Sequence, residues 1–138
     1  MTDNSAPGFG AHPTHSIEIT PYPALVRAEL HGQTIASSRQ AVVMAEANYA
    51  PVCYFPRAHV RMDALRPVAH STYCPFKGHA SYFDIRVDAH TVARGAWSYE
   101  TPYDEMLAIK MCIAFSWCAM TAWFREDSHL PAPTSLLL

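Results

Sequence analysis

Three charged residues lie within apolar or aromatic segments and carry groups that can transfer protons. Lys77 stands in the segment CPFKG, Glu46 follows the apolar run AVVMA, and Glu100 ends the segment WSYE. A lysine removed from water can act as a base or form an imine, and a carboxylate beside aromatic rings can act as an acid or a base. We therefore predict Lys77, Glu100 and Glu46 as catalytic residues for acid–base chemistry.

The same residues also have a structural interpretation, which the sequence leaves open. Lys77 is then a solvated or ion-paired residue, and Cys74 is a small buried hydrophobe. The two glutamates would instead form ion pairs that fix loops, with Arg57, Arg61 or Lys77 as partners.

Aromatic residues near these charges are typical of the walls of a small-molecule site. Such sites are mostly apolar and contain few polar groups, although tyrosine and tryptophan also serve as core residues. Cys74 lies three residues before Lys77, and a thiol near a lysine can hold a reactive thiolate. The ligand-binding residues that we predict are Arg57, Tyr54, Cys74, Tyr82, Trp97 and Tyr99.

The chain contains few signals for metal, cofactor or nucleophilic chemistry. Among eight histidines, His70 and His79 flank Cys74, but this spacing matches no zinc motif and no C-x-x-C pair occurs. No cofactor motif is present, and no G-x-S-x-G elbow surrounds Ser37, Ser38 or Ser81. We predict a site without metal or cofactor.

Composition limits the classes of partner. The 138 residues are 50% hydrophobic and 16% charged, with a formal net charge of −2 and no basic stripe that would favour nucleic acid. No apolar run is long enough to span a membrane, and the first residues resemble no signal peptide. We therefore expect a cytoplasmic protein whose four cysteines are reduced thiols.

The elements that would position these residues are mostly short strands. We predict a flexible N-terminal tail over residues 1–15, one β-rich domain over 16–126, and a C-terminal tail over 127–138. Residues 25–30 and 34–36 flank a turn and predict a hairpin, and residues 80–87 and 91–97 predict a second antiparallel pair. Residues 41–45 fit either a strand or a helical turn.

The C-terminal third combines one helix with an apolar segment. Pro102 followed by two acids predicts a short helix to about Cys112, and a strand is expected after it. The segment 111–124 contains Trp117, Met120 and Trp123, and this either forms the interface of a homodimer or fills the core. The expected class is mainly β, a small barrel or open sandwich of short antiparallel strands.

Several short segments, in this order, carry a resemblance to a known family. They include YFPR at residues 54–57, CPFKG at 74–78, ASY at 80–82 and WSYE at 97–100. Over about residues 12–116 the chain resembles the family called domain of unknown function 427, which also bears the name nucleotidyltransferase-like domain. The resemblance implies a compact pseudo-barrel, similar to the β-tent domains of methionine sulfoxide reductase B and cereblon. The structural zinc of those relatives is not expected here, because the C-x-x-C pairs are missing.

Two departures from the family pattern bear on function. Residues 58–60 and 116–120 are apolar or histidine-containing where the resemblance implies acidic or polar residues. Our main hypothesis is a small-molecule-binding domain that performs isomerisation, cyclisation or hydration on a small organic substrate. The alternatives are a non-catalytic ligand-binding or protein-interaction module and, more weakly, nucleotidyl transfer.

Overall fold

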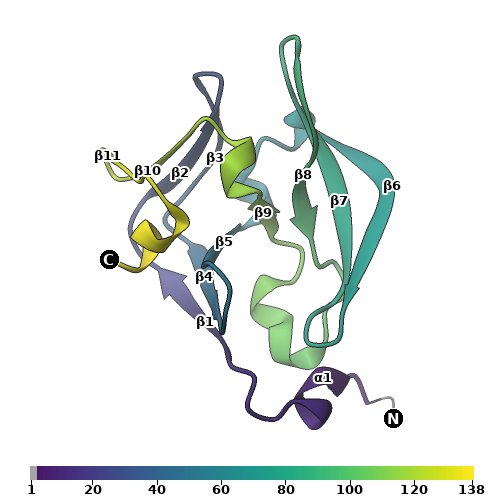
Figure 1. The fold of residues 1–138 in the computed structure, drawn as a ribbon. Helices are drawn as coiled ribbons and strands as arrows, with labels where there is room; N and C mark the ends of the chain where they lie inside the picture. The colour runs from purple at the N-terminus through teal and green to yellow at the C-terminus, as the bar shows by residue number, and fades with distance from the viewer. Residues whose placement is uncertain (1–2) are drawn as a thin grey trace.

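The fold is built from two antiparallel sheets, as a computed structural model of the chain describes for residues 3–138 (Figure 1). The larger sheet has seven strands in the order β1-β4-β5-β9-β8-β7-β6. Its strands are β1 (Ile17–Tyr22), β4 (Ala41–Glu46), β5 (Val52–Phe55), β6 (Leu65–Cys74), β7 (Gly78–Val87), β8 (His90–Ser98) and β9 (Ile113–Phe115).

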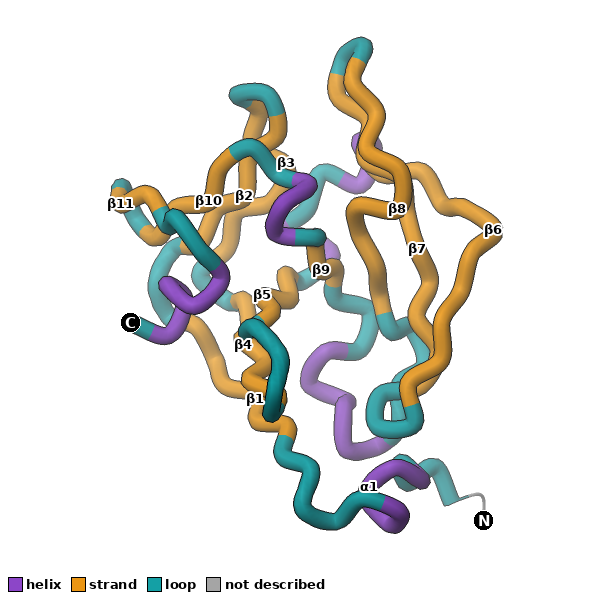
Figure 2. The backbone as a smooth tube through the Cα atoms, viewed as in Figure 1, coloured by secondary structure: helices purple, strands orange, loops and turns teal. Residues whose placement is uncertain are grey.

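The smaller sheet has four strands in the order β11-β10-β2-β3. Its strands are β2 (Val26–Leu30), β3 (Gln33–Ser38), β10 (Ala122–Arg125) and β11 (Ser128–His129). The mainly β class of short antiparallel strands is confirmed. Of the two expected arrangements, a closed barrel is not formed, because β1 and β6 remain separate edges of the larger sheet (Figure 2). A single bridge, between Ala36 and Val60, joins β3 to the loop after β5.

The helices are short and lie in the connections. The α-helix is α1 (Pro7–Ala11), and none of the helices in residues 3–138 is long and apolar enough to cross a membrane. The remaining turns are 3₁₀-helices: η1 (Arg57–His59), η2 (Met62–Ala64), η3 (Asp104–Ile109), η4 (Trp117–Ala119) and η5 (Pro133–Leu137).

The strongest sequence patterns predicted their elements correctly. β7 pairs with β8 and β2 pairs with β3, both antiparallel, so both predicted hairpins are confirmed. The ambiguous run 41–45 is part of β4, where it pairs with both β1 and β5. The short helix after Pro102 is η3, and β9 follows it as the expected strand.

Hydrophobic residues form a separate cluster on each face of the larger sheet. Alternation along β5 and β9 places Phe55 and Ile113 in the cluster beneath the smaller sheet, while Tyr54 and Ala114 belong to the other cluster. That second cluster includes Met106 and residues that face the cavity described below. The larger sheet is therefore buried on both faces at its centre.

The apolar segment 111–124 contributes Met120 and Trp123 to the core. Of the two interpretations given for it, a homodimer interface and a filled core, the burial of these residues supports the second. Trp123 is 3% exposed, and its ring stacks on Trp117 with centroids 4.3 Å apart. Met120 is buried in the same cluster. Met120 and Trp123, two of the three residues on which the predicted homodimer interface rested, are therefore buried, Trp117 is half-buried, and the oligomeric state stays a prediction.

Both predicted tails contain ordered structure that packs on the domain. Within residues 1–15, of which Met1 and Thr2 lie outside the described part, α1 contacts the β6–β7 turn through Gly8 N–H, which donates to Pro75 O at 2.9 Å. Within 127–138, Leu130 and Leu136 are buried in the core beneath the smaller sheet. The prediction of a tail with little regular structure therefore does not hold for α1, and the predicted C-terminal tail packs on its own domain.

Candidate functional site

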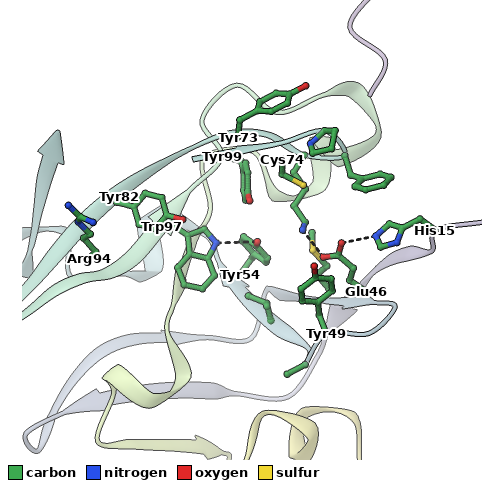
Figure 3. A pocket seen from close by; sticks show the side chains of 16 residues that line it. His15, Glu46, Tyr49, Tyr54, Tyr73, Cys74, Tyr82, Arg94, Trp97 and Tyr99 are labelled. Atoms are coloured by element: carbon green, nitrogen blue, oxygen red, sulfur yellow. Dashed lines mark hydrogen bonds and ion pairs between the residues drawn. The ribbon is translucent and has the colours of Figure 1, made fainter. Parts of the chain in front are cut away.

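A cavity of about 640 Å³ lies over one face of the larger sheet, between the β4–β5 side and the β6–β7–β8 side (Figure 3). Two of the predicted catalytic residues, Glu46 and Lys77, line it. The predicted ligand-binding residues that line it are Tyr54, Cys74, Tyr82, Trp97 and Tyr99. This volume is within the usual range for small-molecule sites.

A chain of three polar side chains forms one wall of the cavity. Lys77 Nζ donates to Glu46 Oε1 at 2.6 Å, and His15 Nε2 lies 2.8 Å from Glu46 Oε2. The side chains of Lys77 and Glu46 are only 12% and 10% exposed. Because both carboxylate oxygens are engaged, Glu46 bridges the side chains of Lys77 and His15.

The turn between β6 and β7 determines where Lys77 points. Lys77 N–H donates to Cys74 O at 3.1 Å, and Lys77 O accepts from Tyr103 N–H at 3.1 Å. Gly78 follows with φ at 111°, a conformation that side-chain-bearing residues rarely adopt. The CPFKG segment thus fixes the backbone on both sides of the lysine.

His15 is the site residue that sequence analysis missed. It comes from the segment before β1, and its ring stacks on Phe76 with centroids 4.2 Å apart. Phe9 also packs against Phe76, at 4.9 Å between centroids, so α1 and His15 are held on the same turn. The Pro- and Gly-rich composition of this segment gave no signal for that position.

Arg57 and Glu100, which we predicted at the site, lie elsewhere. Arg57 Nη1 donates to Glu100 Oε2 at 3.2 Å, and its Nη2 donates to buried Ser98 at 2.9 Å. Trp97 and Tyr99 face the cavity, so alternation sends Ser98 and Glu100 to the opposite face of the strand. Arg57 and Glu100 border a different hollow and form the ion pair of the structural interpretation.

Three neighbouring aromatic residues, Tyr54, Trp97 and Tyr99, form part of the cavity wall. Trp97 Nε1–H donates to Tyr54 Oη at 3.4 Å, and Tyr99 lies beside them (Figure 3). Burial raises the pKa of Tyr54 well above its ordinary value, and nearby Glu46 adds to this shift. Burial, and then the neighbouring Tyr54, raise the pKa of Tyr99 in the same direction. Both phenols therefore remain protonated throughout the physiological range.

The four cysteines all lie in the described part of the chain, and each is a free thiol. Cys74 lines the cavity near Lys77, while Cys53 is buried in the core, where burial raises its pKa. Among residues 3–138, no group of three or more His, Cys, Asp or Glu side chains is arranged to hold a metal ion.

The raised pKa values of the buried Cys53 thiol and of the Tyr54 and Tyr99 phenols predict that the protein loses stability at alkaline pH. Cys53, Tyr54 and Tyr99 hold their protons in the folded state at pH values where the unfolded chain has lost them. The free energy of unfolding should therefore fall above about pH 9 through Cys53, and more steeply above about pH 10 through the tyrosines. Each group contributes at most about 1.4 kcal/mol per pH unit.

Urea unfolding at a series of alkaline pH values measures this dependence. The control is Cys53→Ala, which should reduce the decline that begins near pH 9, to which the raised pKa of Cys112 also contributes, and leave the one that begins near pH 10. A free energy of unfolding that stays constant beyond the ordinary tyrosine pKa would contradict the prediction.

The fold and site define an antiparallel β domain with one aromatic-walled cavity that contains a buried ion pair. Residues 18–126 match the model of a family described as a domain of unknown function (DUF427). The chain belongs to this family, as the sequence resemblance indicated. Comparison with curated proteins found no match. His15 precedes the matched region, whereas Glu46 and Lys77 lie within it.

Proposed function

We propose that this protein binds a small organic molecule in the cavity and performs acid–base chemistry on it, such as isomerisation, cyclisation or hydration, without a cofactor. The observation that carries the proposal is the chain Lys77–Glu46–His15 along the wall of an aromatic cavity. Similar wall compositions, apolar with few polar groups, are typical of ligand sites.

Each of the three connected side chains, Lys77, Glu46 and His15, has a role in this proposal. Lys77 has three N–H donors, of which Glu46 accepts one, and no other acceptor for Nζ occurs among residues 3–138. Two N–H groups are thus left to hold and polarise a ligand oxygen. Glu46 accepts the proton that leaves the substrate, and His15 exchanges protons between Glu46 and the cavity mouth.

Binding without turnover is the alternative, and one observation favours it. Both oxygens of Glu46 already accept or share hydrogen bonds within the protein, so a substrate must displace one of them before proton transfer. Nucleotidyl transfer has weaker support, because Glu46 is the one carboxylate among the described lining residues and magnesium-dependent transfer uses paired carboxylates.

A thermal-shift screen of small organic compounds, with nucleotides plus magnesium included, tests the proposal. We expect organic compounds to raise the melting temperature of the wild type and of Glu100→Gln, whose ion pair lies outside the cavity. Lys77→Arg keeps a cation beside Glu46 but moves its donors, and should lose most of the affinity. A screen in which only nucleotides with magnesium bind would favour the transferase alternative.

Catalysis is then separated from binding by isotope exchange. Each compound that binds is incubated with the protein in D₂O, and exchange at its acidic C–H positions is followed by NMR. We expect exchange with the wild type and Glu100→Gln but not with Glu46→Gln, because the amide cannot accept the proton. Binding with no exchange for any compound would support the non-catalytic module.

A further inference from the structure

Two tyrosine hydroxyls in the cavity wall have donor capacity that the protein does not use. Tyr54 is 2% exposed and Tyr99 is 8% exposed. A hydroxyl carries one donor, and no acceptor for either O–H occurs among residues 3–138. Both residues line the cavity, so these unused donors are available to a molecule bound there.

The geometry aims both hydroxyls into the cavity. Tyr54 Oη accepts a hydrogen bond from Trp97 Nε1–H, so its own hydrogen must point away from the indole. Tyr99 Oη has no hydrogen bond within the described residues, yet no fully buried polar atom there lacks a partner. The Tyr99 hydroxyl therefore borders open cavity space, and Figure 3 shows this side chain directed toward Tyr54.

We infer that Tyr54 Oη–H, Tyr99 Oη–H and Lys77 Nζ–H together form an oxyanion-binding site, and that the ligands of this cavity are flat, unsaturated carboxylates. This inference rests on the proposed function and specifies its substrate class. The donors hold the carboxylate or the enolate derived from it, and the faces of Trp97 and Tyr82 contact the planar body.

The charges around the cavity agree with an anionic ligand. Lys77 and Arg94 line it as cations, and Glu46 is the one carboxylate among the described lining residues. Both oxygens of Glu46 are engaged by Lys77 and His15, so its negative charge is compensated before a ligand arrives. The high pKa values of the two phenols keep them as donors.

An aromatic cage for a cationic ligand is the competing interpretation. Quaternary and primary ammonium groups do bind over tryptophan and tyrosine faces. Here, however, a cation would approach the ammonium of Lys77, and Glu46, the one carboxylate among the described lining residues, is already engaged by Lys77 and His15. The donor arrangement favours oxyanions over cations of the same size.

Three probes of one shape and different charge test this inference: benzoate, benzamide and benzylammonium. NMR titration should show that benzoate binds most tightly and benzylammonium most weakly. Tyr99→Phe should reduce benzoate affinity roughly tenfold or more, because it removes one hydrogen bond to a charged group. It should leave stability unchanged, because the lost hydroxyl has no protein partner. Tyr54→Phe should reduce benzoate affinity in the same way.

The matched control is Tyr73→Phe. Tyr73 also lines the cavity, but its hydroxyl is hydrogen-bonded to that of Tyr103, 2.6 Å away, so benzoate affinity should not change. Tightest binding by benzylammonium, or unchanged benzoate affinity in both Tyr99→Phe and Tyr54→Phe, would overturn the oxyanion site and leave the small-molecule pocket intact. No binding by any probe or screened compound would instead overturn the proposed function itself.

Discussion

Replacing Trp123 with alanine should lower the free energy of unfolding by about 3–5 kcal/mol, the usual cost of removing a buried aromatic side chain. Trp123 on β10 is buried between the sheets, where it packs against Phe55 and Trp117. Its indole N–H donates to Trp117 O at 3.2 Å, so truncation also leaves that carbonyl without its donor. Urea unfolding followed by circular dichroism measures the change.

Two further variants make this result decisive. Leu107→Ala removes an exposed apolar side chain and should change stability by no more than about 0.5 kcal/mol. Trp123→Lys should unfold the protein, because it places a charge in the core. If wild type scatters light as a dimer of the 15.4 kDa chain and Trp123→Lys is a folded monomer, the residue is an interface residue and the core assignment is wrong.

The second large effect concerns the buried ion pair. Lys77→Met should destabilise the protein by roughly 3 kcal/mol, because it leaves the Glu46 carboxylate, whose side chain is only 10% exposed, with His15 as its one remaining protein partner. The matched control is Arg39→Met. Arg39 and Glu126 form an ion pair of similar length, 2.7 Å, but their side chains are 61% and 47% exposed. Its loss should cost at most about 1 kcal/mol.

A double variant shows whether the cost arises from an uncompensated charge. Lys77→Met with Glu46→Leu removes both charges, and should be less destabilising than the sum of the two single changes. Equal costs for Lys77→Met and Arg39→Met would show that the Lys77–Glu46 pair is solvated, in contradiction to its burial. Thermal and urea unfolding of the four variants supply the comparison.

The sequence predicted the strands that carry clear alternation and the motifs between them. Residues 80–97 alternate around a turn, and they form the β7–β8 hairpin. The CPFKG segment combined a proline, a glycine and a lysine, and it does place Lys77 in a cavity. These features depend on neighbours in the chain, which a single sequence displays directly.

The errors concern contacts between distant parts of the chain. We predicted that Glu100 lies beside Lys77 in the site. Strand alternation instead places Glu100 on the face opposite Trp97 and Tyr99. His15 meets Glu46 only because α1 and Phe76 hold its segment against the β6–β7 turn. Which strands end the larger sheet depends on pairing between distant segments, such as β1 with β4 and β5 with β9, and the alternation within one strand does not identify its partner.

The position of β9 in the sheet has a consequence for how the protein is made. This strand joins the two halves of the larger sheet, since Ala114 pairs with both Tyr54 on β5 and Trp97 on β8. A nascent chain that has not yet released residues 113–115 lacks the element that brings the cavity walls together. Such non-local pairing forms slowly. The cavity walls are therefore expected to come together only when β9 pairs with β5 and β8, later than the β7–β8 hairpin forms.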